Sequence, residues 1–190
     1  MIILSEKIEN IFYIIFEKII ANFGIFNTAY INLYGPLVLN EITQAKISKT
    51  DNVLVVGCGA VPSTAILLYN KTGANITAID IDKRAVKKAK KLINRKKYHK
   101  YIQINHSDIK NYELISRHSV IIIAKQVEKT DDLLNIIYKN SKNDVKIIFR
   151  TYSNKNKNNI ENKIKKYFLI LNINISYKAV YSYICKKKVV

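Results

Sequence analysis

Short apolar runs alternate with amphipathic stretches along most of this chain. Residues 53–56 and 120–124 are apolar on both faces, which is typical of strands buried in a parallel sheet. Residues 83–95 place an apolar stripe opposite a lysine-rich face, which is typical of a surface helix. The same patterns predict strands over 52–57, 75–80, 101–105, 119–124 and 144–150, alternating with helices over 62–72, 83–95, 130–141 and 159–168 and a short helix near 110–117.

The order of these elements predicts an α/β fold with one doubly wound sheet. Five units of the strand–helix type read as parallel, and two strands near 169–176 and 179–186 follow them. The last strand alternates apolar and polar side chains, as a half-exposed antiparallel strand does. A polar loop rich in Lys and Asn is expected over 151–158.

The first 48 residues predict a helical extension in front of this domain. Apolar residues recur at helical spacing over 1–24, and a second helix is expected over 37–47. Charges interrupt the apolar runs of the first helix, so we expect neither a membrane span nor a membrane partner. A basic start and a cleavage site are missing, so a signal peptide is not expected either. We place the boundary near Ser48, between an extension of residues 1–48 and a domain of residues 49–190.

A glycine pair, Gly57 and Gly59, follows the first strand. Both positions accept backbone angles that other residues avoid, and Pro62 suits the first turn of the next helix. The N-terminus of that helix would direct N–H groups and partial positive charge over the glycines. Asp80 ends the second strand about twenty residues later, the separation expected for an acid that binds ribose hydroxyls. We therefore expect an adenosine site rather than an ordinary βα turn, with Asp82 as the cap of the following helix.

Asp108 occupies the corresponding position after the third strand, directly behind Ser107. Ligands of open α/β sheets bind at the carboxyl ends of strands, near the point where the strand order reverses. There the Asp108 carboxylate either accepts a hydrogen bond from an adenine amino group or caps the short helix that follows. Lys125, Gln126 and Val127 follow the fourth strand at its carboxyl end, beside the same crevice.

Composition leaves the partner open. The 32 basic and 14 acidic residues give a net charge of +18. An RNA partner is one explanation. A chain-wide bias toward Lys, Asn and Ile is the other, and lysines spread along the whole chain favour it. The two cysteines, Cys58 and Cys185, and three histidines argue against a disulfide scaffold and a dedicated metal site, and they fit a reducing cytoplasm.

The glycine pair, Asp80 and Asp108 resemble the motifs of class I S-adenosylmethionine-dependent methyltransferases. Residues 56–64 and 78–82 are also similar to motifs of the nicotianamine synthase group within that fold, and this similarity covers roughly residues 50–187. The resemblance implies a Rossmann-like seven-stranded sheet with S-adenosylmethionine as the cofactor. It implies that the glycines let main-chain N–H groups approach the methionine portion. The implied cofactor contacts are Gly57, Cys58, Gly59, Asp80, Ile81, Ser107, Asp108 and Ala124.

The N-terminal extension supplies candidate substrate contacts. Tyr30, Tyr34 and Glu41 loosely resemble aromatic and acidic residues in the longer helical N-terminal part of nicotianamine synthases. Tyr30 and Tyr34 either cover a ligand or pack between helices. No residue is assigned a catalytic role from the sequence.

The resemblance implies a cytoplasmic transferase that directs a nucleophile to a carbon attached to a sulfonium. Our first hypothesis is a small-molecule methyltransferase, which releases S-adenosylhomocysteine. The second is an aminocarboxypropyl transferase related to nicotianamine synthase, which releases methylthioadenosine. The third is a basic RNA-binding module that kept the fold and lost catalysis.

Overall fold

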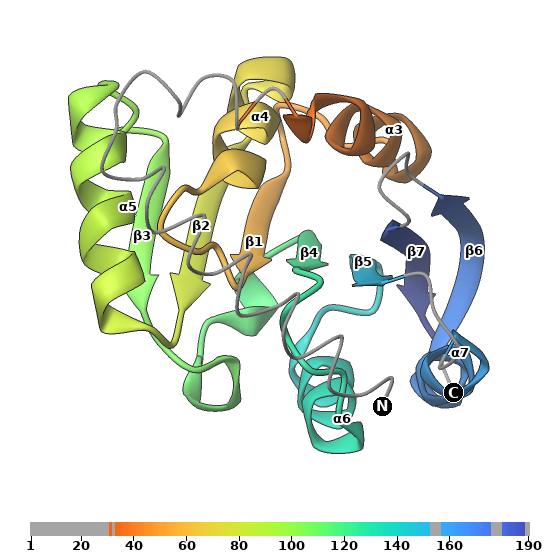
Figure 1. Cartoon of the computed structure of the whole chain (residues 1–190). Coiled ribbons are helices and arrows are strands. Elements are labelled where there is room, and N and C mark those ends of the chain that lie inside the picture. The colour runs from red at the N-terminus through yellow and green to blue at the C-terminus, as the bar shows by residue number, and fades with distance from the viewer. Residues whose placement is uncertain (1–30, 32, 153–156, 176–179, 189–190) are drawn as a thin grey trace, which may run out of the picture.

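The computed structural model describes residues 31, 33–152, 157–175 and 180–188. Within these residues, helices cover both faces of a seven-stranded sheet (Figure 1). In chain order the elements are α3 (Gly35–Ala45), β1 (Asn52–Val56), α4 (Ser63–Thr72), β2 (Asn75–Asp80), α5 (Lys83–Arg95), β3 (Ile102–His106), the 3-10 turns η1 (Ile109–Asn111) and η2 (Ile115–Arg117), β4 (Val120–Ile123), α6 (Asp131–Asn140), β5 (Lys146–Tyr152), α7 (Lys157–Tyr167), β6 (Phe168–Ile175) and β7 (Val180–Lys187).

The strands lie in the order β3-β2-β1-β4-β5-β7-β6. The first five strands of this order are parallel to one another, whereas β7 runs antiparallel to both β5 and β6. The chain moves outward from β1 to β3 and then returns to place β4 on the other side of β1. The strand order therefore reverses between β1 and β4, where open α/β sheets bind their ligands. The doubly wound, seven-stranded sheet expected from the sequence is confirmed.

Each face of the sheet carries its own apolar core. Val53 and Val55 of β1 belong to a buried cluster with side chains of α3, α4 and α5. Leu54 and Val56 belong to a second buried cluster with side chains of α6 and α7. Successive strand residues point to opposite faces, so a strand covered on both sides is apolar at every position.

Two predictions about the second half of the chain were wrong in detail. The expected helix near 110–117 is two 3-10 turns, η1 and η2, whose buried side chains are Ile109 and Ile115. Two apolar anchors six positions apart do not make a helical stripe. In addition, β5 runs on to Tyr152, because its pairing with β7 continues there after its pairing with β4 has ended at Phe149.

Three element boundaries differ from those expected from the sequence. The polar loop expected over 151–158 loses its first two residues to β5, and α7 already begins at Lys157. The first turn of α4 begins at Ser63, so Pro62 stands at the N-cap position instead of inside the helix. Asp82 caps α5 as predicted, because its carboxylate accepts hydrogen bonds from the N–H groups of Arg84 and Ala85.

Helix α3 shares its core with the sheet. Val38 and Ala45 are buried in the same cluster as Val53. The domain boundary near Ser48 stays a prediction, and the predicted helix over 1–24 lies outside the described residues. None of the helices in the described part of the chain is long and apolar enough to cross a membrane.

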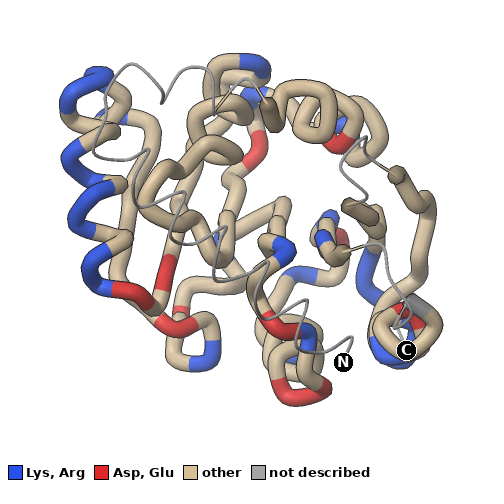
Figure 2. The backbone as a smooth tube through the Cα atoms, in the orientation of Figure 1, with Lys and Arg blue, Asp and Glu red and all other residues tan. Residues whose placement is uncertain are grey.

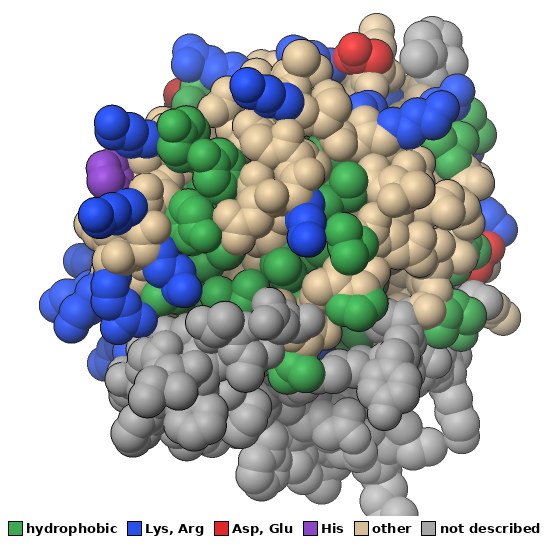
Figure 3. Space-filling view, turned by 90° about the horizontal axis from the view of Figure 1, so that it is seen from above, with side chains coloured by type: hydrophobic (Ala, Val, Ile, Leu, Met, Phe, Trp, Pro, Cys, Tyr) green, Lys and Arg blue, Asp and Glu red, His purple; other side chains and the backbone are tan. Residues whose placement is uncertain are grey.

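Basic residues are densest along α5 (Figure 2). The exposed ones, which form the basic face of this helix, are Lys83, Arg84, Lys87, Lys90, Lys91 and Arg95. In the view from above, further Lys and Arg side chains are scattered over the visible part of that side of the molecule (Figure 3). The basic face lies opposite the buried stripe of Val86, Ala89 and Ile93, so it is the solvated side of an amphipathic helix.

Candidate functional site

A cavity of about 570 Å³ lies at the carboxyl ends of the central strands. This is the edge where the strand order reverses between β1 and β4, and the volume suits a small-molecule ligand. The residues predicted from the sequence that line it are Gly57, Cys58, Gly59, Asp80, Ile81, Ser107, Asp108 and Ala124, together with Tyr34. Tyr30 lies outside the described residues. The structure thus brings the predicted contacts together, and their role toward a ligand stays a prediction.

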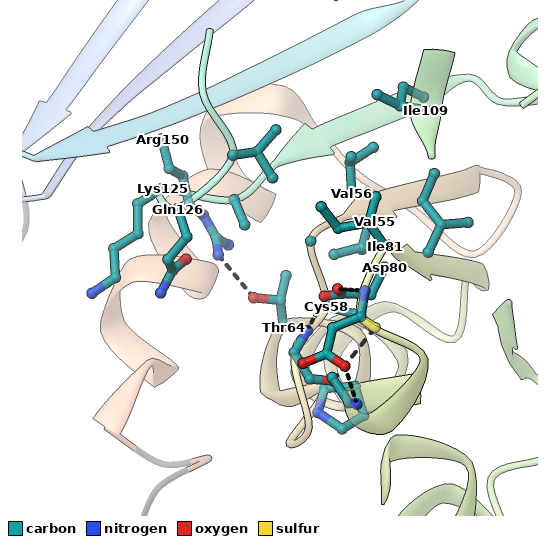
Figure 4. Close-up of a pocket in the computed structure, with 18 of the residues that line it drawn as sticks. Val55, Val56, Cys58, Thr64, Asp80, Ile81, Ile109, Lys125, Gln126 and Arg150 are labelled. Atoms are coloured by element: carbon teal, nitrogen blue, oxygen red, sulfur yellow. Dashed lines mark hydrogen bonds between the residues drawn. The ribbon is translucent and has the colours of Figure 1, made fainter. Parts of the chain in front are cut away.

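Asp80 faces the glycine loop. Its Oδ2 accepts a hydrogen bond from the N–H of Gly59 at 2.8 Å, and its Oδ1 accepts one from the N–H of Asp82 at 2.9 Å (Figure 4). An ionised carboxylate has about four acceptor sites, so Asp80 can hold the loop and still accept bonds from two hydroxyls. The side chain is half-buried on the cavity wall, which strengthens such bonds relative to bulk water.

The glycine loop uses its own N–H groups. Gly57 and Cys58 donate to the carbonyl oxygen of Ile79 at 2.9 and 3.2 Å, and Gly59 donates to Asp80. The first two of these bonds continue the β1–β2 ladder, and the expected approach of main-chain N–H groups to the methionine portion stays a prediction. The N-terminus of α4 also adjoins the cavity: residues 63–65 line it, and Pro62 provides no side-chain cap.

Gly57→Ala is expected to destabilise the fold. Gly57 has a φ of +81°, and a Cβ there would lie 2.6 Å from Cγ2 of Val127. The left-handed conformation costs roughly 1–2 kcal/mol and overpacking adds roughly 1–3 kcal/mol. Urea unfolding should therefore show a loss of about 2–5 kcal/mol. Gly35→Ala is the matched control, since a Cβ at Gly35 meets no atom within 4 Å. Equal urea midpoints for the two variants would refute this explanation of the glycine.

Asp108 caps the turn that follows it. Its Oδ1 accepts a hydrogen bond from the N–H of Lys110 at 2.9 Å, so the capping alternative is confirmed. The side chain is also exposed on the cavity wall, where a carboxylate can bond to a ligand amino group as well. Beside it, Ile81 is 72% exposed at the end of β2. This apolar side chain at the cavity rim offers a contact surface for a ring.

Lys129 holds the loop that follows β4. Its ammonium donates hydrogen bonds of 2.6 Å to the carbonyl oxygens of Ala124 and Val127, and its side chain is buried. These bonds close the segment 124–128, which forms one wall of the cavity. Burial, with a smaller contribution from the positive charge of Arg150, lowers the pKa of Lys129 to about 7. The sequence did not reveal this residue, because a lysine after a strand normally belongs to the surface.

The free energy of unfolding is expected to rise with pH above about 7 through Lys129. The folded protein releases this proton near pH 7, whereas the unfolded chain keeps it to about pH 10.5. In that window the unfolded state binds more protons, so the folded state gains up to about 1.4 kcal/mol per pH unit. Urea unfolding at pH 7, 8 and 9 should show this gain in the wild type and lose it in Lys129→Met. Lys87→Met, on the exposed face of α5, should keep the wild-type slope. If the free energy of unfolding rises equally with pH in the wild type and in Lys129→Met, the gain does not come from Lys129.

A buried ion pair joins α3 to the sheet beside the cavity. Arg150 of β5 donates from Nε to Oε1 of Glu41 at 2.8 Å and from Nη2 to Oε2 at 2.6 Å. Its Nη1 donates to Oγ1 of Thr64 in α4 at 2.8 Å, and the hydroxyl of Ser182 in β7 donates to Glu41 at 2.6 Å. Glu41 is fully buried, and Arg150 is 4% exposed. Four elements therefore meet in one polar network.

The sequence held one signal for this network. Glu41 lies four positions from both Leu37 and Ala45, so an acid occupies the buried stripe of α3. Charged residues are almost never fully buried unless they are paired, so the position indicates a basic partner. The identity of that partner, Arg150, comes from the fold alone.

Comparison with known proteins identifies the domain. A family model described as a methyltransferase domain matches residues 47–188, which include β1 to β7 and all eight predicted cofactor contacts. This chain belongs to that family. The family is one of S-adenosylmethionine-dependent transferases, and the seven-stranded sheet has the fold of the class I methyltransferases.

Individual relatives agree with this family. The L-histidine 2-aminobutanoyltransferase of Yersinia pestis is 31% identical over 107 residues, which are 55% of this chain and 39% of that protein. The matching stretch therefore spans only about two fifths of that relative's length. A putative S-adenosylmethionine-dependent methyltransferase of Methanococcus maripaludis, mmp1179, has a TM-score of 0.75 at 16% identity, with 92% of this chain and 93% of that chain covered. The nicotianamine synthase MtNAS, in complex with MTA and tNA, has a TM-score of 0.70 at 19% identity, with 82% and 60% covered.

Proposed function

We propose that this chain transfers the methyl group of S-adenosylmethionine to a small-molecule acceptor. The observation that carries the proposal is the Asp80 carboxylate, which lies on the cavity wall and accepts the N–H of Gly59 at 2.8 Å. That arrangement sets an acid and a tight main-chain loop side by side at the reversal of the sheet, as adenosyl binding requires. A cavity of about 570 Å³ leaves room for a nucleoside and a small acceptor.

Different residues of the cavity would contact different parts of the ligand. Asp80 would hold the ribose hydroxyls, and Asp108 the adenine amino group, with Ile81 against the ring. Ala124 would lie beside the reactive carbon, held there by the bond from Lys129 to its carbonyl oxygen. When bound, the cofactor supplies a carbon made electrophilic by a sulfonium. The protein would contribute orientation and the exclusion of water, since an amine or thiolate acceptor needs no strong base.

Aminocarboxypropyl transfer is the second candidate. It is supported by the 31% identity with the aminobutanoyltransferase of Yersinia pestis and by the likeness to MtNAS. Both reactions would use the same adenosyl site. They differ in which carbon next to the sulfonium faces the acceptor.

The spent cofactor tests the proposal. The purified chain is incubated with S-adenosylmethionine and fractions of a small-molecule extract, and the nucleosides are separated by mass. We expect S-adenosylhomocysteine, formed only with an acceptor fraction. If methylthioadenosine forms instead, the reaction is aminocarboxypropyl transfer, the second candidate. No cofactor affinity in calorimetry would refute both.

A small acceptor fits the charge distribution better than RNA. The exposed basic face of α5 lies opposite the buried stripe of that helix, and none of its lysines or arginines lines the cavity in the described part of the chain. A cytoplasmic location is part of the proposal. It is supported by Cys58 and Cys185, which are buried and form no disulfide in the described part of the chain, as is usual in a reducing compartment.

A further inference from the structure

The cavity has two chemically different ends. Asp80, Asp82 and Asp108 lie at the end over β2 and β3, together with the exposed Lys110. Figure 4 shows Lys125, Gln126 and Arg150 grouped at the opposite end, over β4 and β5. The proposed adenosine contacts occupy the first end. The second end therefore faces whatever part of the cofactor or acceptor extends beyond the reactive carbon.

Arg150 has N–H groups that donate to no acceptor among the described residues. A guanidinium has five N–H groups. Three of them donate to Glu41 and Thr64, and the other two have no acceptor among the described residues. With a side-chain exposure of 5%, Arg150 cannot rely on bulk water for those two groups. Because Arg150 lines the cavity, a ligand oxygen is the natural acceptor.

Lys125 adds a positive charge at the same end. Its ammonium lies 4.9 Å from the ring centroid of Tyr152 and 5.9 Å from that of Tyr34, so two aromatic faces orient it. The N-terminus of α4, with Thr64 and Ala65, lines the cavity here and adds partial positive charge. Of the acids nearby, Glu41 is bound by Arg150 and Ser182, and Glu128 is exposed.

We propose that the cavity end formed by Lys125, Arg150 and the N-terminus of α4 binds a carboxylate group. A carboxylate offers two coplanar oxygens for guanidinium N–H groups and a charge for the ammonium. It comes either from the amino-acid part of the cofactor or from the acceptor. The inference rests on the proposed function, since it takes the adenosyl part to lie at the other end.

Lys125→Met tests the site while keeping the apolar stem of the side chain. S-adenosylhomocysteine and methylthioadenosine share the adenosyl and thioether parts, but only the first has a carboxylate. If the cofactor provides the carboxylate, calorimetry should show about 10-fold weaker binding of S-adenosylhomocysteine to the variant and unchanged binding of methylthioadenosine. Lys87→Met is the matched control and should bind both as the wild type does.

A second titration covers the acceptor. Acetate and acetamide are added to protein saturated with S-adenosylhomocysteine, and binding is followed by NMR. If the acceptor provides the carboxylate, acetate alone should bind, and Lys125→Met should lose that binding. The proposal is overturned if Lys125→Met changes neither titration, or if it weakens both nucleosides equally. Failure of the wild type to bind either nucleoside would instead refute the proposed function.

Discussion

Asp80→Ala is expected to lower the affinity for S-adenosylhomocysteine at least 100-fold. The substitution removes the carboxylate that we assign to the two ribose hydroxyls, and hydrogen bonds to charged groups contribute about 1.5–3 kcal/mol each. It also frees the N–H groups of Gly59 and Asp82, so the loop loses the acceptor that holds its shape. Calorimetric titration of the variant at neutral pH measures the loss.

Two further variants separate ligand binding from folding. Asp144→Ala removes an exposed carboxylate from the turn before β5, at the opposite end of that strand from the cavity lining, and should bind as the wild type does. Asp80→Asn keeps one acceptor oxygen and should fall between wild type and Asp80→Ala. A folded Asp80→Ala protein with affinity within about threefold of the wild type, roughly 0.7 kcal/mol, would rule out the ribose role.

Glu41→Gln is expected to reduce the free energy of unfolding by about 3–5 kcal/mol, because it leaves a buried guanidinium without its counter-charge. Glu41 is fully buried and accepts three hydrogen bonds, two from Arg150 and one from Ser182. Through them it joins α3 to β5 and β7. Urea unfolding at pH 7 should show a lower midpoint with an unchanged slope, since the exposed surface stays the same.

Glu161→Gln provides the matched surface control. Glu161 pairs with Lys165 one helical turn away, at 2.7 Å, and the lysine is largely exposed. The same chemical change there should cost less than about 1 kcal/mol. Replacing both buried partners, as Glu41→Leu with Arg150→Met, should restore much of the loss, because no unpaired charge remains. If Glu41→Gln were no more costly than Glu161→Gln, the ion pair would not be the link that holds α3.

The order of elements and the proposed adenosyl site followed from local features of the sequence. A strand buried on both faces must be apolar at every position, so β1 and β4 were recognisable without any knowledge of their neighbours. The glycine pair and Asp80 belong to one βαβ unit, whose short connections bring them together in any chain of this pattern. For the same reason Asp82 was recognisable as the cap of α5.

Ladder pairing decided the details that the pattern missed. The end of β5 depends on its antiparallel neighbour β7, which pairs with it as far as Tyr152. The N–H groups of Gly57 and Cys58 donate to Ile79 across the β1–β2 ladder, an acceptor that the sequence did not reveal. Composition and spacing carry no information about which acceptor an N–H group meets.

The sequence by itself determined the doubly wound fold and the acid beside the glycine loop, because periodicity and short-range spacing are local properties. Only the tertiary structure decided that Glu41 meets Arg150, 109 positions along the chain, and that Lys129 turns inward to the carbonyl oxygens of its own loop. A buried charge is stable only beside its partner, and that partner is chosen by how the elements pack.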